Sequence, residues 1–157
     1  MGKGKRADAV LFGFDFQVNA AIVLMLENIK ELQSLRLESE NEDIDIKLYS
    51  GSHILAQAKA IVNSSTDFTN VRNNLKKALK SLSEGSKKVQ TEKLILITNS
   101  PNPLNEDASR SIFWGPARRG FNTLPESAQK IITGYLSQMD QPLDTDQFVI
   151  QVVPFET

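Results

Sequence analysis

The sequence predicts an α/β fold in which helices flank a mixed central sheet. Residues 43–48 alternate apolar and polar side chains, which is typical of a strand with one buried face. Residues 94–97 are continuously apolar, which is typical of a central strand buried on both faces. Helical spacing of apolar residues around these segments gives the order helix, three strands, helix, strand, then a further helix and strand.

The composition fits one domain, 1–157, with enough apolar residues (40%) to form a core. The chain has no cysteine, which excludes a disulfide framework, a zinc–thiolate site and a thiol nucleophile. The formal net charge is only −1, but the charges are unevenly spread: residues 38–45 hold five acids and no base, and residues 72–93 hold seven bases and two acids. This distribution suits a metal ion plus a polyanion, although many charge runs are merely solvated faces.

The first helix is expected over residues 16–32, and residues 1–9 are expected to be disordered. The apolar residues of this helix recur at spacings of three and four: Phe14, Val18, Ile22, Met25, Ile29 and Leu32. The apolar run 18–26 is too short to span a membrane, so no membrane partner is expected. Gln17, near the helix start, is either a capping or surface residue or a buried polar residue that needs a partner.

Three strands are expected to form a meander after this helix. A short strand over residues 35–38 leads into the acidic segment, and the alternating strand 43–48 follows. Residues 50–52, Ser-Gly-Ser, supply a turn into the return strand, because glycine readily adopts a positive φ.

The register of this hairpin depends on which residues form its loop. If residues 50–52 form it, Asp43 lies opposite Lys59 and Asp45 lies opposite Gln57. One face of the hairpin then carries two carboxylates, a carboxamide and an amine, which is a costly cluster to build for stability alone. The simpler interpretation is a solvated polar face on an edge hairpin.

Such a cluster has the parts of a divalent-metal phosphodiesterase site: an aspartate, a second oxygen ligand and a lysine two residues further on. Hard oxygen atoms bind Mg²⁺, which keeps several waters and takes other ligands from the substrate phosphate. The metal lowers the pKa of a bound water and offsets charge at phosphorus, while the lysine ammonium orients the nucleophile or stabilises the anion.

A basic helix is expected over residues 67–82. Basic side chains on this helix and just beyond it are expected to contact DNA phosphates without reading bases. They are Arg72, Lys76, Lys77, Lys80, Lys87 and Lys88.

The remaining elements are expected in this order: a strand over 93–98, a short helix over 105–114, a loop over 115–120, a helix over 123–139 and a strand over 147–155. Thr123 is expected to cap the second of these helices, with Pro125 in its first turn. Arg118 and Arg119 in the loop are expected either to contact a phosphate group or to make no contact. The lone His53 is expected to be an exposed or edge residue rather than a catalyst.

Three segments carry a resemblance to a known family: residues 13–17 (Gly-Phe-Asp-Phe-Gln), Glu38 with residues 42–46, and residues 57–59 (Gln-Ala-Lys). With them the chain resembles the PD-(D/E)xK, restriction-endonuclease-like superfamily, in the Mrr-like variant that has glutamine in place of the glutamate. More narrowly, it resembles the N-terminal double-stranded-DNA endonuclease domain of bacterial antiphage defence effectors. The resemblance covers about residues 12–98, and more loosely the rest. It implies an αβββαβ core, here extended by a C-terminal helix and strand.

The resemblance also implies roles for individual residues. Asp43 matches the metal-binding aspartate, Gln57 the second motif position and Lys59 the lysine. Glu38 and Gln17 match positions that are often polar and face the site.

We expect the side-chain oxygens of Asp43 and Gln57 and the backbone carbonyl of Ala58 to converge on Mg²⁺ (or Mn²⁺). A carboxamide supplies an oxygen but no charge. Metal affinity is therefore expected to depend mainly on Asp43 and on a neighbouring acid, Asp45 or Glu38.

The function implied by the resemblance is that of a Mg²⁺-dependent endodeoxyribonuclease acting on double-stranded DNA in the cytoplasm. Its implied partners are a sensor or NTPase domain or subunit and further copies of the chain, because cutting two strands generally needs two sites. The chain is then an excised nuclease domain or a subunit of a larger effector. The alternative is a non-catalytic DNA-binding or scaffolding module of the same fold, and a ribonuclease would use the same chemistry.

Overall fold

The computed structural model describes the backbone of residues 2–38, 40–61, 68–113 and 116–154, and the side chains of the same residues except 2–11 and 68–70. The helices and strands are α1 (Gly2–Glu27), β1 (Leu32–Glu38), β2 (Asp43–Leu48), β3 (His53–Lys59), α2 (Phe68–Ser86), β4 (Thr91–Thr98), α3 (Asp107–Arg110), β5 (Ala117–Gly120), α4 (Glu126–Leu136) and β6 (Phe148–Val152). Short 3-10 turns lie at Ser111–Phe113, Phe121–Thr123 and Thr145–Gln147.

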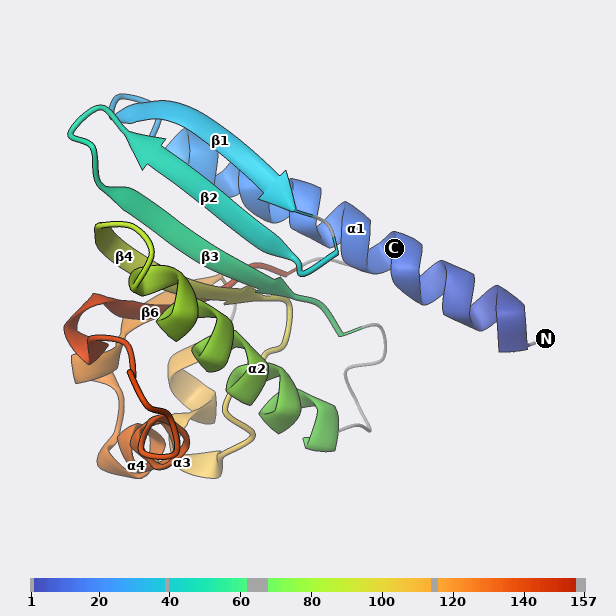
Figure 1. Cartoon of the computed structure of the whole chain (residues 1–157). Coiled ribbons are helices and arrows are strands. Elements are labelled where there is room, and N and C mark those ends of the chain that lie inside the picture. Colours follow the sequence, from blue (N-terminus) through green and yellow to red (C-terminus); the bar gives the residue numbers. More distant parts are fainter. Residues whose placement is uncertain (1, 39, 62–67, 114–115, 155–157) are drawn as a thin grey trace.

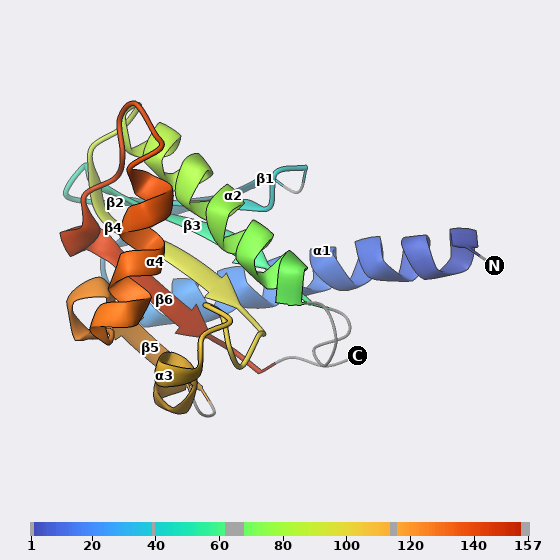
Figure 2. The same cartoon turned by 90° about the horizontal axis from the view of Figure 1, so that it is seen from below.

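The described strands form one mixed sheet in the order β1-β2-β3-β4-β6-β5. Strands β1, β2 and β3 pair antiparallel, β3–β4 and β4–β6 pair parallel, and β5 pairs antiparallel with β6. Helix α1 covers one face of the sheet, whereas α2 and α4 cover the other (Figures 1 and 2). The predicted class, a mixed sheet flanked by helices with a further C-terminal helix and strand, is confirmed.

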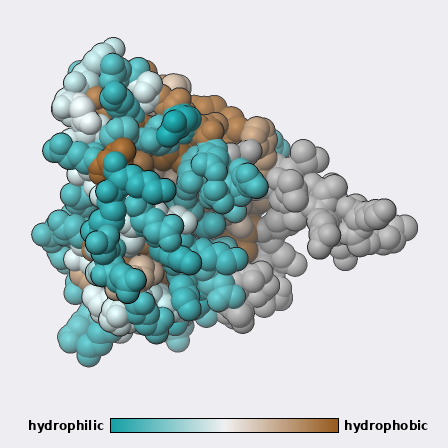
Figure 3. Space-filling model, viewed as in Figure 1, coloured by the Kyte–Doolittle hydropathy of each residue, from teal (hydrophilic) through white to brown (hydrophobic). Residues whose placement is uncertain are grey.

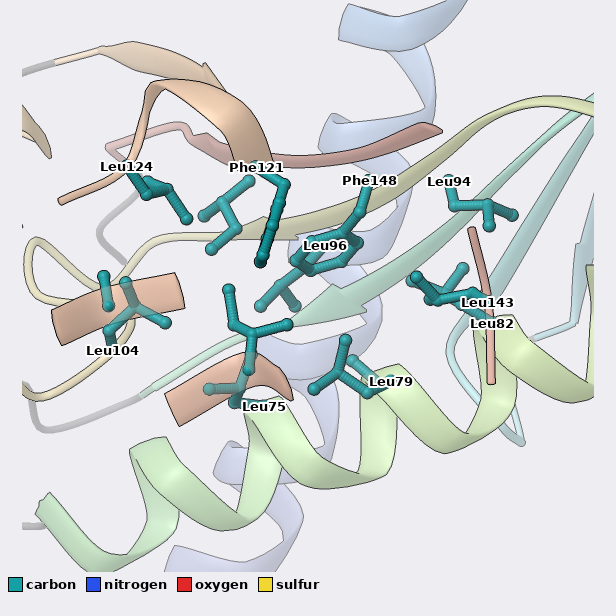
Figure 4. Packing of buried hydrophobic residues seen from close by; sticks show 14 of the residues in the cluster. Leu75, Leu79, Leu82, Leu94, Leu96, Leu104, Phe121, Leu124, Leu143 and Phe148 are labelled. Carbon is teal, nitrogen blue, oxygen red and sulfur yellow. The ribbon is translucent and has the colours of Figure 1, made fainter. Parts of the chain in front are cut away.

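Strand β4 explains why one segment of the sequence is continuously apolar. Its Ile95 and Ile97 belong to the core layer under α1, and its Leu94 and Leu96 belong to the layer under α2 and α4. Figure 4 shows Leu75 and Leu79 of α2 facing Leu96 across the second layer. The prediction that residues 94–97 form a strand buried on both faces is confirmed, since all four are buried.

The first helix differs from its prediction at both ends. It ends at Glu27 rather than at residue 32, because the Asn28 side chain donates to the Leu24 carbonyl (2.8 Å) and turns lead directly into β1. At the other end the backbone is already helical from Gly2, so α1 runs through residues 2–9, for which the sequence analysis expected disorder.

Two C-terminal predictions were also wrong. Residues 117–120 form the edge strand β5 rather than a loop, because they pair with β6. Thr123 does not cap α4: it lies in a 3-10 turn and its hydroxyl donates to the Gly120 carbonyl (2.7 Å). The helix begins three residues later, directly after Pro125, which occupies the N-cap position.

The outer face of α1 carries exposed apolar side chains. Phe14, Ile22 and Leu26 lie at spacings of eight and four residues, and their exposed fractions are 48%, 45% and 61%. The brown area along the upper edge of Figure 3 lies over α1 and β1. No described helix is long and apolar enough to cross a bilayer.

Candidate active site

The β2–β3 hairpin brings the predicted site residues together in a register that differs from the predicted one. Its loop is Tyr49–Gly51 rather than 50–52, because the Leu48 amide donates to the Ser52 carbonyl (2.9 Å). Gly51 takes the last loop position with φ +95°, as a three-residue hairpin loop requires. The shift of the loop by one residue moves every cross-strand pair by two.

The observed pairs are therefore Asp43 with Gln57 and Asp45 with Leu55. The predicted pairs of Asp43 with Lys59 and of Asp45 with Gln57 were wrong. These side chains nevertheless share one face of the hairpin, as predicted, because a shift of two residues keeps every side chain on its side of the sheet. Glu38 of β1 pairs with Asp43, so Glu38, Asp43 and Gln57 form one row across three strands.

The row faces α2, because the intervening Ile44 and Ile46 pack against α1 on the opposite face. Its side chains line a groove of about 510 Å³ between β1–β3 and the last turns of α2. Gly85 of α2 lets the helix come this close: a Cβ at this position would lie 2.8 Å from Leu55 Cδ1. The groove is therefore a product of close helix–sheet packing.

Gln57 and Asp43 are in direct contact at the floor of the groove. The Gln57 side-chain amide donates a hydrogen bond from Nε2 to Asp43 Oδ1. Gln57 is buried, and its Oε1 accepts no hydrogen bond from the described residues. A buried amide oxygen without a donor is costly, so this atom is a candidate ligand for a cation.

The electrostatics of the groove favour a cation beside Asp43. Burial raises the pKa of the Asp43 carboxyl above its usual range, and the neighbouring charges of Glu38, Glu42 and Asp45 raise it further. The ammonium of Lys59 acts in the opposite direction, toward a lower pKa. A divalent cation would relieve the same repulsion.

Lys59 lies beside the row but outside the groove. Its side chain is almost buried, and Nζ lies 3.6 Å from Glu42 Oε1. It lines a narrow neighbouring pocket with Thr98 and Ser100 at the end of β4. Glu42, which the sequence analysis did not single out, has a positive φ of 60° and accepts a backbone hydrogen bond from Ala58 (3.1 Å).

The sequence allowed Gln17 to be either a capping or surface residue or a buried polar residue, and in the structure it is buried. Its Nε2 donates to the backbone carbonyls of Glu38 (3.1 Å) and Asp43 (3.0 Å). It does not line the groove, and it joins α1 to the ends of β1 and β2 from which the two carboxylates project. Gln17 is therefore a positioning residue for the row.

Asp45 is engaged at the outer end of the groove. Its carboxylate lies 2.7 Å from His53 Nδ1 and 3.5 Å from an Arg36 guanidinium nitrogen. His53 is half-buried in this contact rather than exposed, and neither it nor Arg36 was assigned a role from sequence. His53 pairs with Lys47 and lies diagonally from Asp45 across the β2–β3 pair, so this contact could have been predicted only with the correct register.

The donor set fits a hard divalent cation, but not through a cluster of acids. Among the described residues, no three histidine, cysteine, aspartate or glutamate side chains come together to hold a metal ion. The candidate ligands are instead mixed: the Asp43 carboxylate, the buried Oε1 of Gln57 and the Ala58 carbonyl that follows it. Oxygen donors of this kind suit Mg²⁺ or Mn²⁺, which retain waters on their other positions.

The predicted phosphate-binding side chains divide into two groups. Arg72 is used within the fold: its guanidinium donates to the carbonyls of Leu104 (2.6 Å) and Asn105 (3.1 Å). The five lysines are exposed: Lys76, Lys77, Lys80, Lys87 and Lys88.

The two arginines of β5 also have partners within the fold. Arg118 pairs with Glu27 of α1 (3.3 Å), and Arg119 donates to the Ile112 carbonyl (3.2 Å). They are thus tied to α1 and to the preceding 3-10 turn.

Comparison with known proteins adds no relative: no family model, no curated protein and no solved structure matches the chain.

Proposed function

We propose that this chain is a divalent-metal-dependent DNA endonuclease domain that hydrolyses phosphodiester bonds. The observation that carries the proposal is the row Glu38–Asp43–Gln57 across the β1–β3 meander, with Lys59 beside it. The exposed lysines that line a cleft on and after α2 flank it: Lys76, Lys80, Lys87 and Lys88. An acidic floor next to a basic flank suits a metal ion and a polyanionic substrate.

In this proposal Asp43, Gln57 Oε1 and the Ala58 carbonyl would hold Mg²⁺ or Mn²⁺. When bound, such an ion lowers the pKa of a water and offsets negative charge at phosphorus. To hold the ion together with Asp43, the Gln57 amide would present Oε1 in place of Nε2, and Asp43 Oδ1 would then be free of its present hydrogen bond. Gln17 holds the strand ends so that Glu38 and Asp43 stay aligned.

Lys59 supplies fixed positive charge at the edge of the row. Its ammonium orients the attacking water or stabilises the anion that forms on phosphorus. Glu42 pairs with this ammonium, since Lys59 Nζ lies 3.6 Å from Glu42 Oε1. Lys59 is therefore the residue whose loss should damage hydrolysis most without damaging DNA binding.

The biological setting is proposed on the resemblance alone: the effector of a bacterial antiphage defence system, activated when a sensor or NTPase partner brings copies together. The same groove would also accept an RNA phosphodiester. One observation favours a second function, a non-catalytic DNA-binding or scaffolding module: Asp43 and Lys59 are already paired, with Gln57 and Glu42.

The experiment is cleavage of supercoiled plasmid by the purified chain with Mg²⁺, with Mn²⁺ and with EDTA. The nuclease proposal expects nicked or linear products that depend on the metal. Absence of cleavage with either metal, even when two copies are joined, would favour the scaffolding function.

A further inference from the structure

A second groove lies on the other side of α2, between this helix and the end of α4. It has a volume of about 890 Å³. Its walls are Lys76, Lys80, Ser83, Glu84, Lys87 and Lys88 on and after α2, and Tyr135, Gln138, Met139, Asp140 and Gln141 on and after α4. We call this the lysine groove. Its size is that of a ligand-binding cleft rather than of a packing defect.

The charge of the lysine groove is positive although it contains two acids. Four lysines line it against Glu84 and Asp140. All four lysines are exposed, and one of them, Lys87, lies near the Pro142 carbonyl (3.4 Å). A cleft with excess positive charge concentrates anions and attracts phosphodiester chains.

The floor of the lysine groove is less polar than its walls. Tyr135 and Met139 are partly buried and pack against the core layer beneath α2 and α4. An aromatic ring and a thioether beneath ammonium groups suit a ligand that combines phosphates with flat apolar surfaces, which is the chemistry of a nucleic-acid strand.

The lysine groove adjoins the candidate active site. Glu84 and Lys88 line both the lysine groove and the groove that contains Asp43 and Gln57. The two clefts are therefore neighbours across these side chains near the C-terminal end of α2. A strand whose phosphate lies at Asp43 has a basic path leading away from it past Lys88.

We propose that the lysine groove binds the phosphate backbone of the nucleic-acid strand as it leaves the active site. This inference rests on the proposed function for the direction of the strand, but the binding site itself can be tested without cleavage. The chain offers a matched control, because Lys77 is exposed on the same helix and does not line the groove.

The test compares Lys76→Ala/Lys80→Ala with Lys77→Ala in EDTA, by fluorescence anisotropy of labelled oligonucleotides across a salt series. Duplex and single-stranded oligonucleotides of one sequence are separate arms, because both present the same backbone. The double variant should bind several-fold more weakly. Its slope of log affinity against log salt should be shallower by about 1.8 for the duplex, at about 0.9 per phosphate contact, and by about 1.4 for the single strand, at about 0.7 per contact. Lys77→Ala should keep the parental slope.

A change of opposite sign gives a second, independent readout. Asp140→Asn removes an acid that lines the lysine groove but not the candidate active site, and it should tighten binding at low salt. Thermal unfolding verifies that each variant is folded. If the double variant shows its loss in either arm, Lys77→Ala does not, and Asp140→Asn tightens binding in that arm, the inference holds and the arm identifies the strand form. Equal slopes for the double variant and Lys77→Ala in both arms, or unchanged or weaker binding by Asp140→Asn, overturn it.

The result can be separated from the fate of the nuclease proposal. Groove-dependent binding without any metal-dependent cleavage would retain the lysine groove and reject the nuclease. Metal-dependent cleavage with no difference in binding between the double variant and Lys77→Ala would retain the nuclease proposal and reject the lysine groove.

Discussion

The Gln57 amide donates a hydrogen bond to the Asp43 carboxylate across the β2–β3 pair. This contact uses the nitrogen of the amide and leaves its buried oxygen without a donor among the described residues. Without a metal, the Asp43 carboxylate has a hydrogen-bond partner but the Gln57 oxygen has none in the described part of the chain. The Gln57 side chain therefore distinguishes a metal site from a purely structural hydrogen bond.

Gln57→Glu tests whether this contact is a metal site or a structural hydrogen bond. The variant replaces the donor with a second carboxylate beside Asp43, so it should be less stable than the parent in EDTA, because like charges repel at a partly desolvated site. It should gain more stability from Mg²⁺ than the parent does, since a ligand that binds only the folded state stabilises it by RT ln(1 + [L]/Kd), which grows as Kd falls. It should also retain or increase Mg²⁺-dependent cleavage. Thermal unfolding with and without Mg²⁺ measures the first two effects.

Gln33→Glu is the matched control for that experiment, because Gln33 is exposed on β1 and does not line the groove. It should show neither the loss in EDTA nor the extra gain with Mg²⁺. If Gln57→Glu and Gln33→Glu respond to Mg²⁺ alike, Gln57 is not a metal ligand.

The raised pKa of Asp43 predicts a pH dependence of stability. Because its folded-state pKa lies above the unfolded value, the folded protein holds this proton more tightly. The stability linked to Asp43 is therefore greatest at low pH and is lost as the pH rises through the folded-state pKa. Asp43→Asn removes this titration and keeps an oxygen that can accept from Gln57. In EDTA the variant should be more stable than the parent at neutral pH, and the difference should shrink toward about pH 4.

Urea unfolding at the two pH values measures this difference. Asp15→Asn, at an exposed aspartate of α1, is the control and should show little change with pH. An Asp43→Asn variant that is less stable than the parent at neutral pH in EDTA would show that the ionised carboxylate is net stabilising, against this account.

Gln17 should matter for stability and for the site together. Gln17→Ala leaves the Glu38 and Asp43 carbonyls without their donor, which should lower the free energy of unfolding by about 1–3 kcal/mol. Asn19→Ala removes an exposed hydrogen bond on the same helix, to the Asp15 carbonyl, and should cost much less. Urea denaturation distinguishes them. Equal losses would mean that the two carbonyls find other partners.

Two copies of the chain are expected to act together on a DNA duplex. If two sites must meet to break a duplex, joining two copies through a fused dimeric partner should convert nicking or silence into double-strand cleavage. The products are separated as nicked and linear plasmid on a gel. A dilute unfused chain that linearises plasmid as efficiently as the fusion would contradict the requirement for two sites.

The sequence predicted those parts of the fold that local pattern controls. The alternation over 43–48 and the apolar run over 94–97 mark their strands, because each side chain reports which face of the sheet it occupies. Strand β5 could not be predicted in this way: residues 117–120 have no alternation of apolar and polar side chains, and they become a strand only by pairing with β6.

The candidate site was predicted in composition but not in register. The residues Asp43, Gln57 and Lys59 share a face in either register, so period-2 reasoning sufficed to group them. Which of them touch depends on the loop, in which Gly51 takes the last position of 49–51 rather than the central position of 50–52. The lysines of α2 were predicted as a basic face, but a groove between helices depends on how α4 packs, which no local pattern encodes.

The central claim is tested most directly by the rate of plasmid cleavage by Lys59→Ala under conditions where the parent cuts with Mg²⁺ or Mn²⁺. Loss of the ammonium removes charge stabilisation from the transition state, which typically costs about 10²- to 10³-fold in rate. The folding of the variant should be nearly unchanged, because Glu42, left without its partner, is partly exposed. DNA affinity should also persist, because the exposed lysines remain. Cleavage reduced by this factor, with affinity retained, is the result this account predicts; cleavage as fast as the parent's would contradict the assignment of a nuclease site to this hairpin.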